Sequence, residues 1–529
     1  MRSTNLIAFG SGVLPLLALP TLLLHCGSSS PSSSPPADAG SDVVRHVIDA
    51  GGDDGGEGGS EVPPQGMQLV KSMSLLQVDA VTNDGYAIYT DTMTNNVYAI
   101  SVTGGMPQTV ASGVGATAVV FADGPAAVVY ANPNGSQIGQ LYVWTAAKGA
   151  QMLSSASQVG AGSIAFSKDY SHVAFEDGST ATTTSLVVAG VDGSGKSTLV
   201  SMAVVSSKCT PAVAFVGNDA LTSACTMAPG ADAGADGATL TRYAAGSWTP
   251  SVISTSSYPG AIIANGMAAD HVLFFDSGGL EAYAVASGTT AKIDPDGSSF
   301  VVTPDGSKVV YGTTVTADGG AMSPGPYKVS PIASPSPTTL GTGIDAFDGI
   351  SPDGNWVLGF TQQTQAPLYN AVLGSASTPG TPQVLVAMPT TSAIGDDFTT
   401  DSKYCLFTDS ITTTKTLEGS VTSGNLNAVA VSGGMPVQLG TSVWQEAAGP
   451  GSKVIFNPNW NAPANYGFGT ADLQEIDLSK GMSSVKTLVS QADANFYLTA
   501  DKKTIVYSYS TGGGGQPSVQ AGLWAMPTP

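Results

Sequence analysis

Four histidines are the candidate general bases of this chain, because a Ser/His/Asp hydrolase needs a positioned imidazole beside its nucleophile. His25 and His46 precede the periodic part of the sequence, whereas His172 and His271 each open a strongly apolar run. The last two occupy the same position in two copies of a repeat, so we expect them to be structural. The chain has no Gly-x-Ser-x-Gly nucleophile motif. The sequence therefore predicts no catalytic residue.

Residues 190–197 read Gly-Val-Asp-Gly-Ser-Gly-Lys-Ser and fit the phosphate-binding pattern G-x-x-x-x-G-K-[ST] letter for letter. That pattern binds phosphate when a strand leads in and the N-terminus of a helix leads out. The exit here, Thr-Leu-Val-Ser-Met at 198–202, is typical of a strand instead. We interpret the segment as a turn between strands and expect no nucleotide cofactor.

Metal ligands are scarce in the sequence. There is no Cys-x-x-Cys and no His-Glu-x-x-His motif. Asp-Pro-Asp-Gly at 294–297 resembles the start of a calcium loop but lacks the later carboxylate. Asp305, Asp353, Asp401 and Asp501 recur at one position of a polar turn, where an aspartate side chain caps the backbone. We therefore expect no metal site and no cofactor.

One loop has the composition of a ligand contact. Between 457 and 466 it gathers amide and aromatic side chains, namely Asn457, Asn459, Trp460, Asn461 and Tyr466. Aromatic rings beside amide groups suit carbohydrate or peptide ligands, so these five residues form the candidate ligand loop. The alternative is an ordinary asparagine-rich turn.

Two of the four cysteines are candidates for a disulfide. Cys209 and Cys225 flank a predicted hairpin whose turn lies at 217–219, which places them nearly opposite each other. An exported protein can oxidise such a pair. The alternative is a pair of reduced, buried cysteines. Cys405 stands alone.

The composition indicates the elements that carry these residues. Charged residues make up only 11% of the 529 residues, while there are 65 glycines and 33 prolines. This composition, with abundant Ser, Thr and Val, is typical of short strands and many turns, so we expect an all-β fold. The net charge of −21 argues against nucleic acid as a partner, since phosphate repels an acidic surface.

A repeat of roughly 37–50 residues begins near Met67 and recurs about ten times. Each copy has a polar turn such as Ser-Pro-Asp-Gly at 351–354, a strongly apolar strand and a strand of alternating character. A glycine-rich turn and a short last strand follow, as in Gly-Gly-Met-Pro at 104–107 with its following residues. Four short strands per unit at this period are typical of a propeller blade.

The order of turns and strands resembles the TolB-like repeat of β-propellers over nearly the whole of residues 67–529. We therefore predict a propeller of about eight to ten four-stranded blades. The last unit ends after its third strand at 524–526, and residues 68–72 have the pattern of a missing fourth strand. The N-terminal strand is thus expected to close the last blade. One large ring is favoured over two smaller propellers, because no linker divides the region.

Residues 1–25 have the layout of a secretory signal peptide, with Arg2 before an apolar run. The tetrapeptide at 23–26, Leu-Leu-His-Cys, resembles a bacterial lipobox, although His25 replaces the usual small residue. The resemblance implies lipidation of Cys26 and an outer-membrane lipoprotein of a bacterium. Residues 26–66 are predicted to be a disordered Ser/Pro/Gly/Asp tether. The alternative is ordinary cleavage and secretion.

Together these features predict a non-catalytic, envelope-anchored binding or scaffolding protein. We expect a monomer that recognises an envelope protein or glycan through a propeller face and contacts the membrane only through its lipid. The alternative is a propeller hydrolase or lyase that acts on polysaccharide or peptide.

Overall fold

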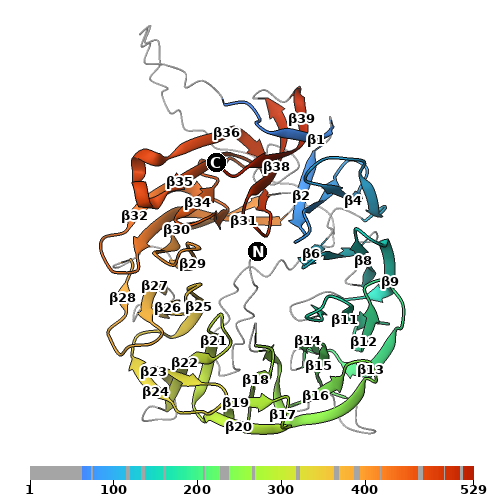
Figure 1. The fold of residues 1–529 in the computed structure, drawn as a ribbon, viewed down its shortest axis with the longest axis vertical. Coiled ribbons are helices and arrows are strands. Elements are labelled where there is room, and N and C mark those ends of the chain that lie inside the picture. The colour runs from blue at the N-terminus through green and yellow to red at the C-terminus, as the bar shows by residue number, and fades with distance from the viewer. Residues whose placement is uncertain are drawn as a thin grey trace, which may run out of the picture.

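The computed structural model describes residues 62–72, 75–114, 119–132, 138–158, 163–206, 209–226, 237–264, 268–316, 322–362, 369–386, 393–416, 419–462, 469–493, 495–512 and 516–529. Within these residues the secondary structure consists of 39 β-strands and two short 3₁₀ turns, η1 (Leu478–Lys480) and η2 (Met482–Ser484). The strands form small antiparallel sheets that follow one another in a ring (Figure 1). The prediction of an all-β propeller is confirmed.

We number the sheets as blades 1 to 10 in chain order. The first five blades consist of β2 (Leu76–Val81), β3 (Tyr86–Asp91), β4 (Asn96–Ser101) and β5 (Gln108–Ala111); β6 (Val119–Asp123), β7 (Ala126–Ala131), β8 (Gly139–Thr145) and β9 (Gly149–Ser157); β10 (Ile164–Phe166), β11 (His172–Asp177), β12 (Thr183–Gly190) and β13 (Ser197–Val204); β14 (Ala212–Val216), β15 (Asp219–Ala224), β16 (Ala238–Ala244) and β17 (Thr249–Ala264); and the end of β17 with β18 (His271–Asp276), β19 (Gly279–Ala284) and β20 (Thr289–Asp294).

The other five blades consist of β21 (Gly297–Val302), β22 (Lys308–Thr316), β23 (Met322–Pro331) and β24 (Thr338–Gly341); β25 (Ala346–Ile350), β26 (Trp356–Gln362), β27 (Tyr369–Ser375) and β28 (Gln383–Val384); β29 (Ile394–Phe398), β30 (Tyr404–Thr416), β31 (Gly419–Ala430) and β32 (Val437–Val443); β33 (Glu446–Ala448), β34 (Lys453–Phe456), β35 (Thr470–Asp477) and β36 (Lys486–Asp493); and β37 (Phe496–Leu498), β38 (Thr504–Gly512), β39 (Gln516–Pro527) and β1 (Met67–Lys71).

Blade 10 takes its outer strand from the other end of the chain. Its strand order is β1-β39-β38-β37, and β1 runs antiparallel to β39, with Met67 opposite Ala525. The predicted closure of the last blade by the N-terminal strand is therefore confirmed. Such a closure joins the two ends of the repeat region and covers an otherwise free sheet edge.

The core of the described residues consists of eleven hydrophobic clusters: ten form a series between neighbouring blades, and a small one surrounds Cys209 and Cys225. Blades 1 and 2, for example, meet around Ile88 and Trp144. The series continues blade by blade, and one cluster joins blade 10 back to blade 1 through Val506 and Leu76. Side chains alternate along each strand, so an apolar run such as β7 faces one neighbour with Ala127 and the other with Val128. This explains why the strands are apolar on both faces.

Two blades share a strand. The 16 residues of β17 pair first with β16 in blade 4 and then with β18 in blade 5, so the two blades form one seven-stranded sheet. No linker separates any two blades in the described part of the chain, consistent with the single ring favoured by the sequence.

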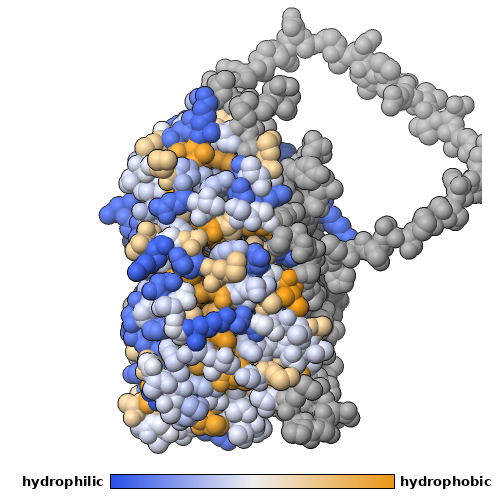
Figure 2. Space-filling view, turned by 90° about the vertical axis from the view of Figure 1, so that its right-hand side faces the viewer, coloured by the Kyte–Doolittle hydropathy of each residue, from blue (hydrophilic) through white to orange (hydrophobic). Residues whose placement is uncertain are grey.

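The outer strands form the edge of the ring, and on the side that Figure 2 shows, hydrophilic and hydrophobic residues are interspersed. The pairing of the outer strand with its neighbour contains a register shift in every blade except blade 7. In blade 7 the outer strand, β28, is only two residues long. Bulges and short edge strands both hinder pairing with another sheet edge.

The polar turn of the repeat joins the inner strand of a blade to its second strand. In blade 7, Ser351 Oγ donates to Asp353 Oδ1 at 2.6 Å and accepts from the Trp356 N–H at 3.0 Å. The same contacts recur in blades 1, 3, 6, 8 and 10. The aspartates therefore cap turns, as the repeat predicts. We call the side of the ring that carries these turns the turn face.

Candidate functional site

The junction between two blades at the turn face, which we call a seam, is filled in three places by the first residue of the second strand. In blade 1 this residue is Tyr86, whose ring lies 5.1 Å from that of Trp144 in blade 2. In blade 3 it is His172, whose ring lies 5.2 Å from Trp248 in blade 4. In blade 8, Tyr404 donates its hydroxyl to the Leu478 carbonyl of blade 9 at 3.3 Å.

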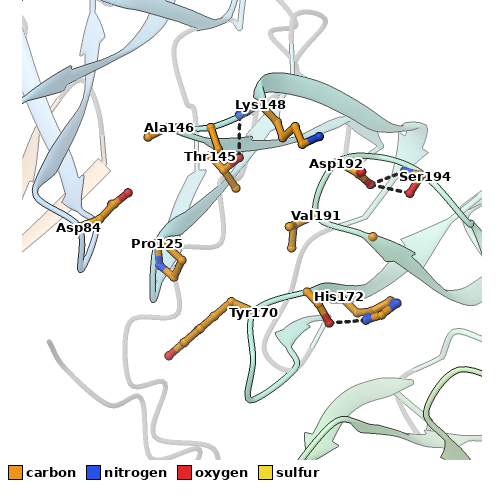
Figure 3. A pocket seen from close by; sticks show the side chains of 13 residues that line it. Asp84, Pro125, Thr145, Ala146, Lys148, Tyr170, His172, Val191, Asp192 and Ser194 are labelled. Atoms are coloured by element: carbon orange, nitrogen blue, oxygen red, sulfur yellow. Dashed lines mark hydrogen bonds between the residues drawn. The ribbon is translucent and has the colours of Figure 1, made fainter.

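The seam between blades 2 and 3 differs from these three. The first residue of β7 is Ala126, which is fully buried and too small to reach blade 3. The turn before it is also the shortest kind, since only Gly124 and Pro125 separate β6 from β7. The result is a pocket of about 490 Å³ that opens on the turn face (Figure 3). Its position follows from the small Ala126, which leaves open the space that Tyr86, His172 and Tyr404 fill in three other seams.

Tyr170 forms one wall of this pocket. It lies in the polar turn of blade 3 with a left-handed φ of 55°, and its ring covers Gly124 so closely that a Cβ there would be 2.3 Å from it. Its hydroxyl donates to Asp123 Oδ1 at 3.2 Å. Desolvation and the neighbouring Asp123 raise the pKa of Tyr170, so the hydroxyl remains protonated. The neutral Tyr170 hydroxyl therefore holds this wall in place, while the Tyr170 ring packs over Gly124.

Hydrogen bonds through Ser171 connect Asp169 to the neighbouring His172 and hold its ring in place. Ser171 Oγ lies 2.7 Å from both Asp169 Oδ1 and His172 Nδ1. Hydrogen bonds from Ser171 lower the pKa of Asp169 to about 2, so it is ionised and takes the single hydroxyl proton. His172 Nδ1 must then be the donor to Ser171. The serine proton thus points to a carboxylate instead of a general base, which is the wrong arrangement for a nucleophile. This trio supports the pocket wall and does not form a triad.

The rim of the pocket is polar and its interior is mainly apolar. Pro125, Ala146 and Val191 line the interior, while Asp84 and Lys148 lie at opposite sides of the opening (Figure 3). Such an arrangement suits an apolar group that enters between polar contacts.

The phosphate-binding pattern at 190–197 is a turn between β12 and β13, as expected. Asp192 Oδ1 accepts from the Ser194 N–H and hydroxyl, which lowers the pKa of Asp192. The Lys196 ammonium bonds the Leu153 carbonyl of blade 2 at 3.0 Å and pairs with Asp177. The lysine that would bind phosphate is therefore engaged between two blades, and no helix follows it.

The predicted disulfide and the described part of the candidate ligand loop do not line this pocket, whereas His172 and part of the 190–197 motif do. Cys26 and Tyr466 lie outside the described residues. Cys209 and Cys225 form a disulfide in the structure, on the chain that enters and leaves the first hairpin of blade 4. The predicted oxidation in the cell stays a prediction.

The candidate ligand loop begins after β34, on the side away from the turn face. Asn457 is buried, and its Oδ1 accepts from the N–H groups of Trp444 at 3.1 Å and Gln445 at 2.6 Å. Asn459 Nδ2 donates to Asp472, and Asn461 is bonded to Thr470 through both backbone groups. These asparagines therefore form hydrogen bonds that stabilise the loop. The role of the loop in ligand binding stays a prediction.

The sequence pattern did not indicate three buried or half-buried acids that have raised pKa values. Desolvation raises the pKa of Asp79, Asp348 and Glu176 to about 7. Asp79 accepts from the Thr90 hydroxyl at 2.6 Å and Gln77 at 2.9 Å. These acids lie on different blades, and no group of three metal-ligating side chains occurs in the described ranges. Asp294 of the calcium-like motif is paired with Lys328 at 2.8 Å.

No helix among the described residues is long and apolar enough to cross a membrane.

No protein-family model matches the chain, and no curated protein is similar to it. Similar solved structures include TolB from Acinetobacter baumannii, at 12% identity and a TM-score of 0.25 over 58% of this chain and 64% of that chain. They also include a putative TolB from Agrobacterium tumefaciens, at 15% identity and a TM-score of 0.25 over 53% and 94% of the two chains.

A third is the β-propeller domain of the Trilobed protease from Pyrococcus furiosus, at 8% identity and a TM-score of 0.34 over 71% and 98%. The chain spans about half the length of the tricorn protease that it also matches. These likenesses concern the propeller fold alone.

Proposed function

We propose that this protein is a non-catalytic binding protein that docks a partner protein on its turn face. The observation that carries the proposal is the open seam between blades 2 and 3, where a mainly apolar pocket lies inside a polar rim. An apolar side chain of the partner fills the space that Tyr86 or His172 fills in the neighbouring seams. Binding interfaces are commonly built from such an anchor in a pocket surrounded by polar contacts.

Two further side chains on the turn face support the proposal that a partner protein docks there. Met106 and Met435 are 90% and 88% exposed, each in a Gly-Gly-Met-Pro turn between the third and fourth strands of a blade. Because both side chains are almost fully exposed, they do not contribute to the packing of the blades. Exposed methionines are adaptable apolar contacts at protein-binding surfaces.

The leader suggests where the protein acts. We propose that residues 1–25 direct export and that Cys26 is acylated, with the membrane reached through the lipid and the tether. Mass spectrometry of the mature N-terminus tests this: a diacylated Cys26 is expected, and a free N-terminus at another residue contradicts it.

Filling the pocket tests the docking proposal. Ala147 is an exposed residue of the pocket rim in the turn between β8 and β9. Ala286 is an exposed residue of the corresponding turn in blade 5 and does not line the pocket between blades 2 and 3. Ala147→Trp is expected to abolish recovery of a partner that the wild type and Ala286→Trp both recover from the envelope fraction. Equal recovery by all three proteins, or by none, contradicts the proposal.

A further inference from the structure

A second seam is open on the turn face, between blades 7 and 8. Trp356 lies opposite Ser375 across β26 and β27, which is the position of Ala126 and Thr145 in blade 2. Here the first residue of the second strand is large, yet a pocket of about 240 Å³ remains beside it. This pocket plays no part in the proposed function above.

Strand register places its main residues on one face of blade 7. Trp356 pairs with Ser375, and Leu373, two residues earlier on β27, pairs with Gln383 of β28. Since side chains alternate along a strand, these four share the face that looks toward blade 8. Val431 of blade 8, at the opposite wall, packs with Trp356 around the cluster that joins the two blades.

The polar groups of this pocket are already organised. Ser375 Oγ accepts from the N–H of Thr378 at 3.0 Å and lies 2.9 Å from the Thr378 hydroxyl, which folds the turn that forms the rim. Gln383 Nε2 donates to the Gly434 carbonyl of blade 8 at 3.0 Å. That bond ties the two walls together and leaves Gln383 Oε1 as an acceptor beside the pocket.

The lining contains no charged side chain among the described residues, in contrast to the pocket between blades 2 and 3. It combines one indole ring, an apolar floor, serine and threonine hydroxyls and one amide. A neutral ligand with an apolar face and several hydroxyls complements this set. Hydroxyls pair with the Ser, Thr and Gln groups, and ring C–H groups lie on the aromatic face.

We infer that the pocket between blades 7 and 8 binds a neutral sugar residue stacked on Trp356. Its volume is below the roughly 300 Å³ at which pockets for drug-sized ligands begin, so it accommodates one ring of a longer glycan. An anionic sugar is disfavoured, because no lining side chain offers a positive charge.

Saturation-transfer NMR on the full-length protein tests the inference. The probes are methyl glucoside, methyl galactoside, N-acetylglucosamine and oligosaccharides of each, with glucuronate as the charged comparison. At least one neutral probe is expected to give signals, and glucuronate none. Absence of signal from every neutral probe, or equal signal from glucuronate, overturns the inference.

Variants locate the site. Trp356→Ala is expected to weaken binding at least about tenfold. Thr381→Trp blocks the pocket from an exposed rim position without altering the core and is expected to abolish binding. Trp248→Ala, another half-buried indole of the turn face, is the matched control and is expected to leave binding unchanged. Ala147→Trp is expected to leave it unchanged as well, so failure here is distinguishable from failure of the partner-docking proposal.

Retained binding in Thr381→Trp would overturn the inference. Displacement of the probes by a proline-rich peptide with higher affinity would also overturn it, since the pocket would then be a peptide site.

Discussion

The seam between blades 1 and 2 and the seam between blades 2 and 3 each lie between two four-stranded antiparallel blades, with a hydrophobic cluster beneath them. In the first, Tyr86 packs on Trp144 and closes the turn face. In the second, Ala126 stands in the place of Tyr86, and the corresponding space is a pocket beside Val191. The comparison teaches that a repeat protein can form a pocket by omitting a side chain, with no insertion and no new element.

The largest effect is expected at the filled seam. Trp144 is fully buried between two blades, so Trp144→Ala leaves a cavity and is expected to lower the free energy of unfolding by about 3–5 kcal/mol. Val191→Ala, at the open seam, removes a half-buried side chain and is expected to cost only about 1 kcal/mol. Chemical denaturation of both variants measures the difference; equal losses would mean that the two seams are packed alike.

An intermediate, pH-dependent effect is expected from the turn that walls the pocket. The folded pKa of Asp169, about 2, lies below the unfolded value of roughly 3.9, so its stabilisation is present above pH 4 and is lost as the pH falls toward 2. Asp169→Asn is expected to cost about 1 kcal/mol at neutral pH, because the site is exposed, and nothing once the pH has fallen well below the folded pKa.

The matched control is Asp305→Asn in blade 6, where hydrogen bonds led by Thr303 likewise lower the aspartate pKa to about 2. Both variants are expected to show the same pH profile in thermal unfolding, but only Asp169→Asn weakens partner binding. A loss of binding in both would show that the turns act on the whole face instead of on one seam.

The smallest effect is expected from the backbone of the turns. Gly354 has a φ of 72°, and the equivalent residue of blade 10, Lys502, has a φ of 60°. Gly354→Ala is expected to cost about 1 kcal/mol, and Lys502→Gly to stabilise by about 0.5 kcal/mol, because a Cβ is strained in this region. Thermal unfolding of both variants against the wild type checks the two signs; destabilisation by Lys502→Gly would contradict the account.

Much of the fold follows from local pattern. The apolar runs, the polar turns at Asp305, Asp353, Asp401 and Asp501, and the missing fourth strand of the last unit depend on neighbours in sequence, and the structure confirms them. The pocket depends on which side chain meets which blade across a seam. Its sequence signal is Gly124-Pro125 followed by Ala126, where blades 1, 3 and 8 have a longer polar turn and an aromatic or imidazole side chain.

The candidate ligand loop shows what composition alone does not decide. Asn457 resembles a ligand contact by composition, but its amide accepts two backbone N–H groups inside the fold. Composition shows that polar groups are present, while tertiary structure decides whether a ligand or the protein itself satisfies them.

The central claim is that the open seam between blades 2 and 3 is the place where a partner docks. A photo-crosslinking amino acid at Ala147, compared with the same residue at Ala286, tests it directly in the producing cell. The account predicts a discrete protein adduct, identified by mass spectrometry, from position 147 and none from position 286. Adducts of equal yield at both positions, or none at 147, would contradict it.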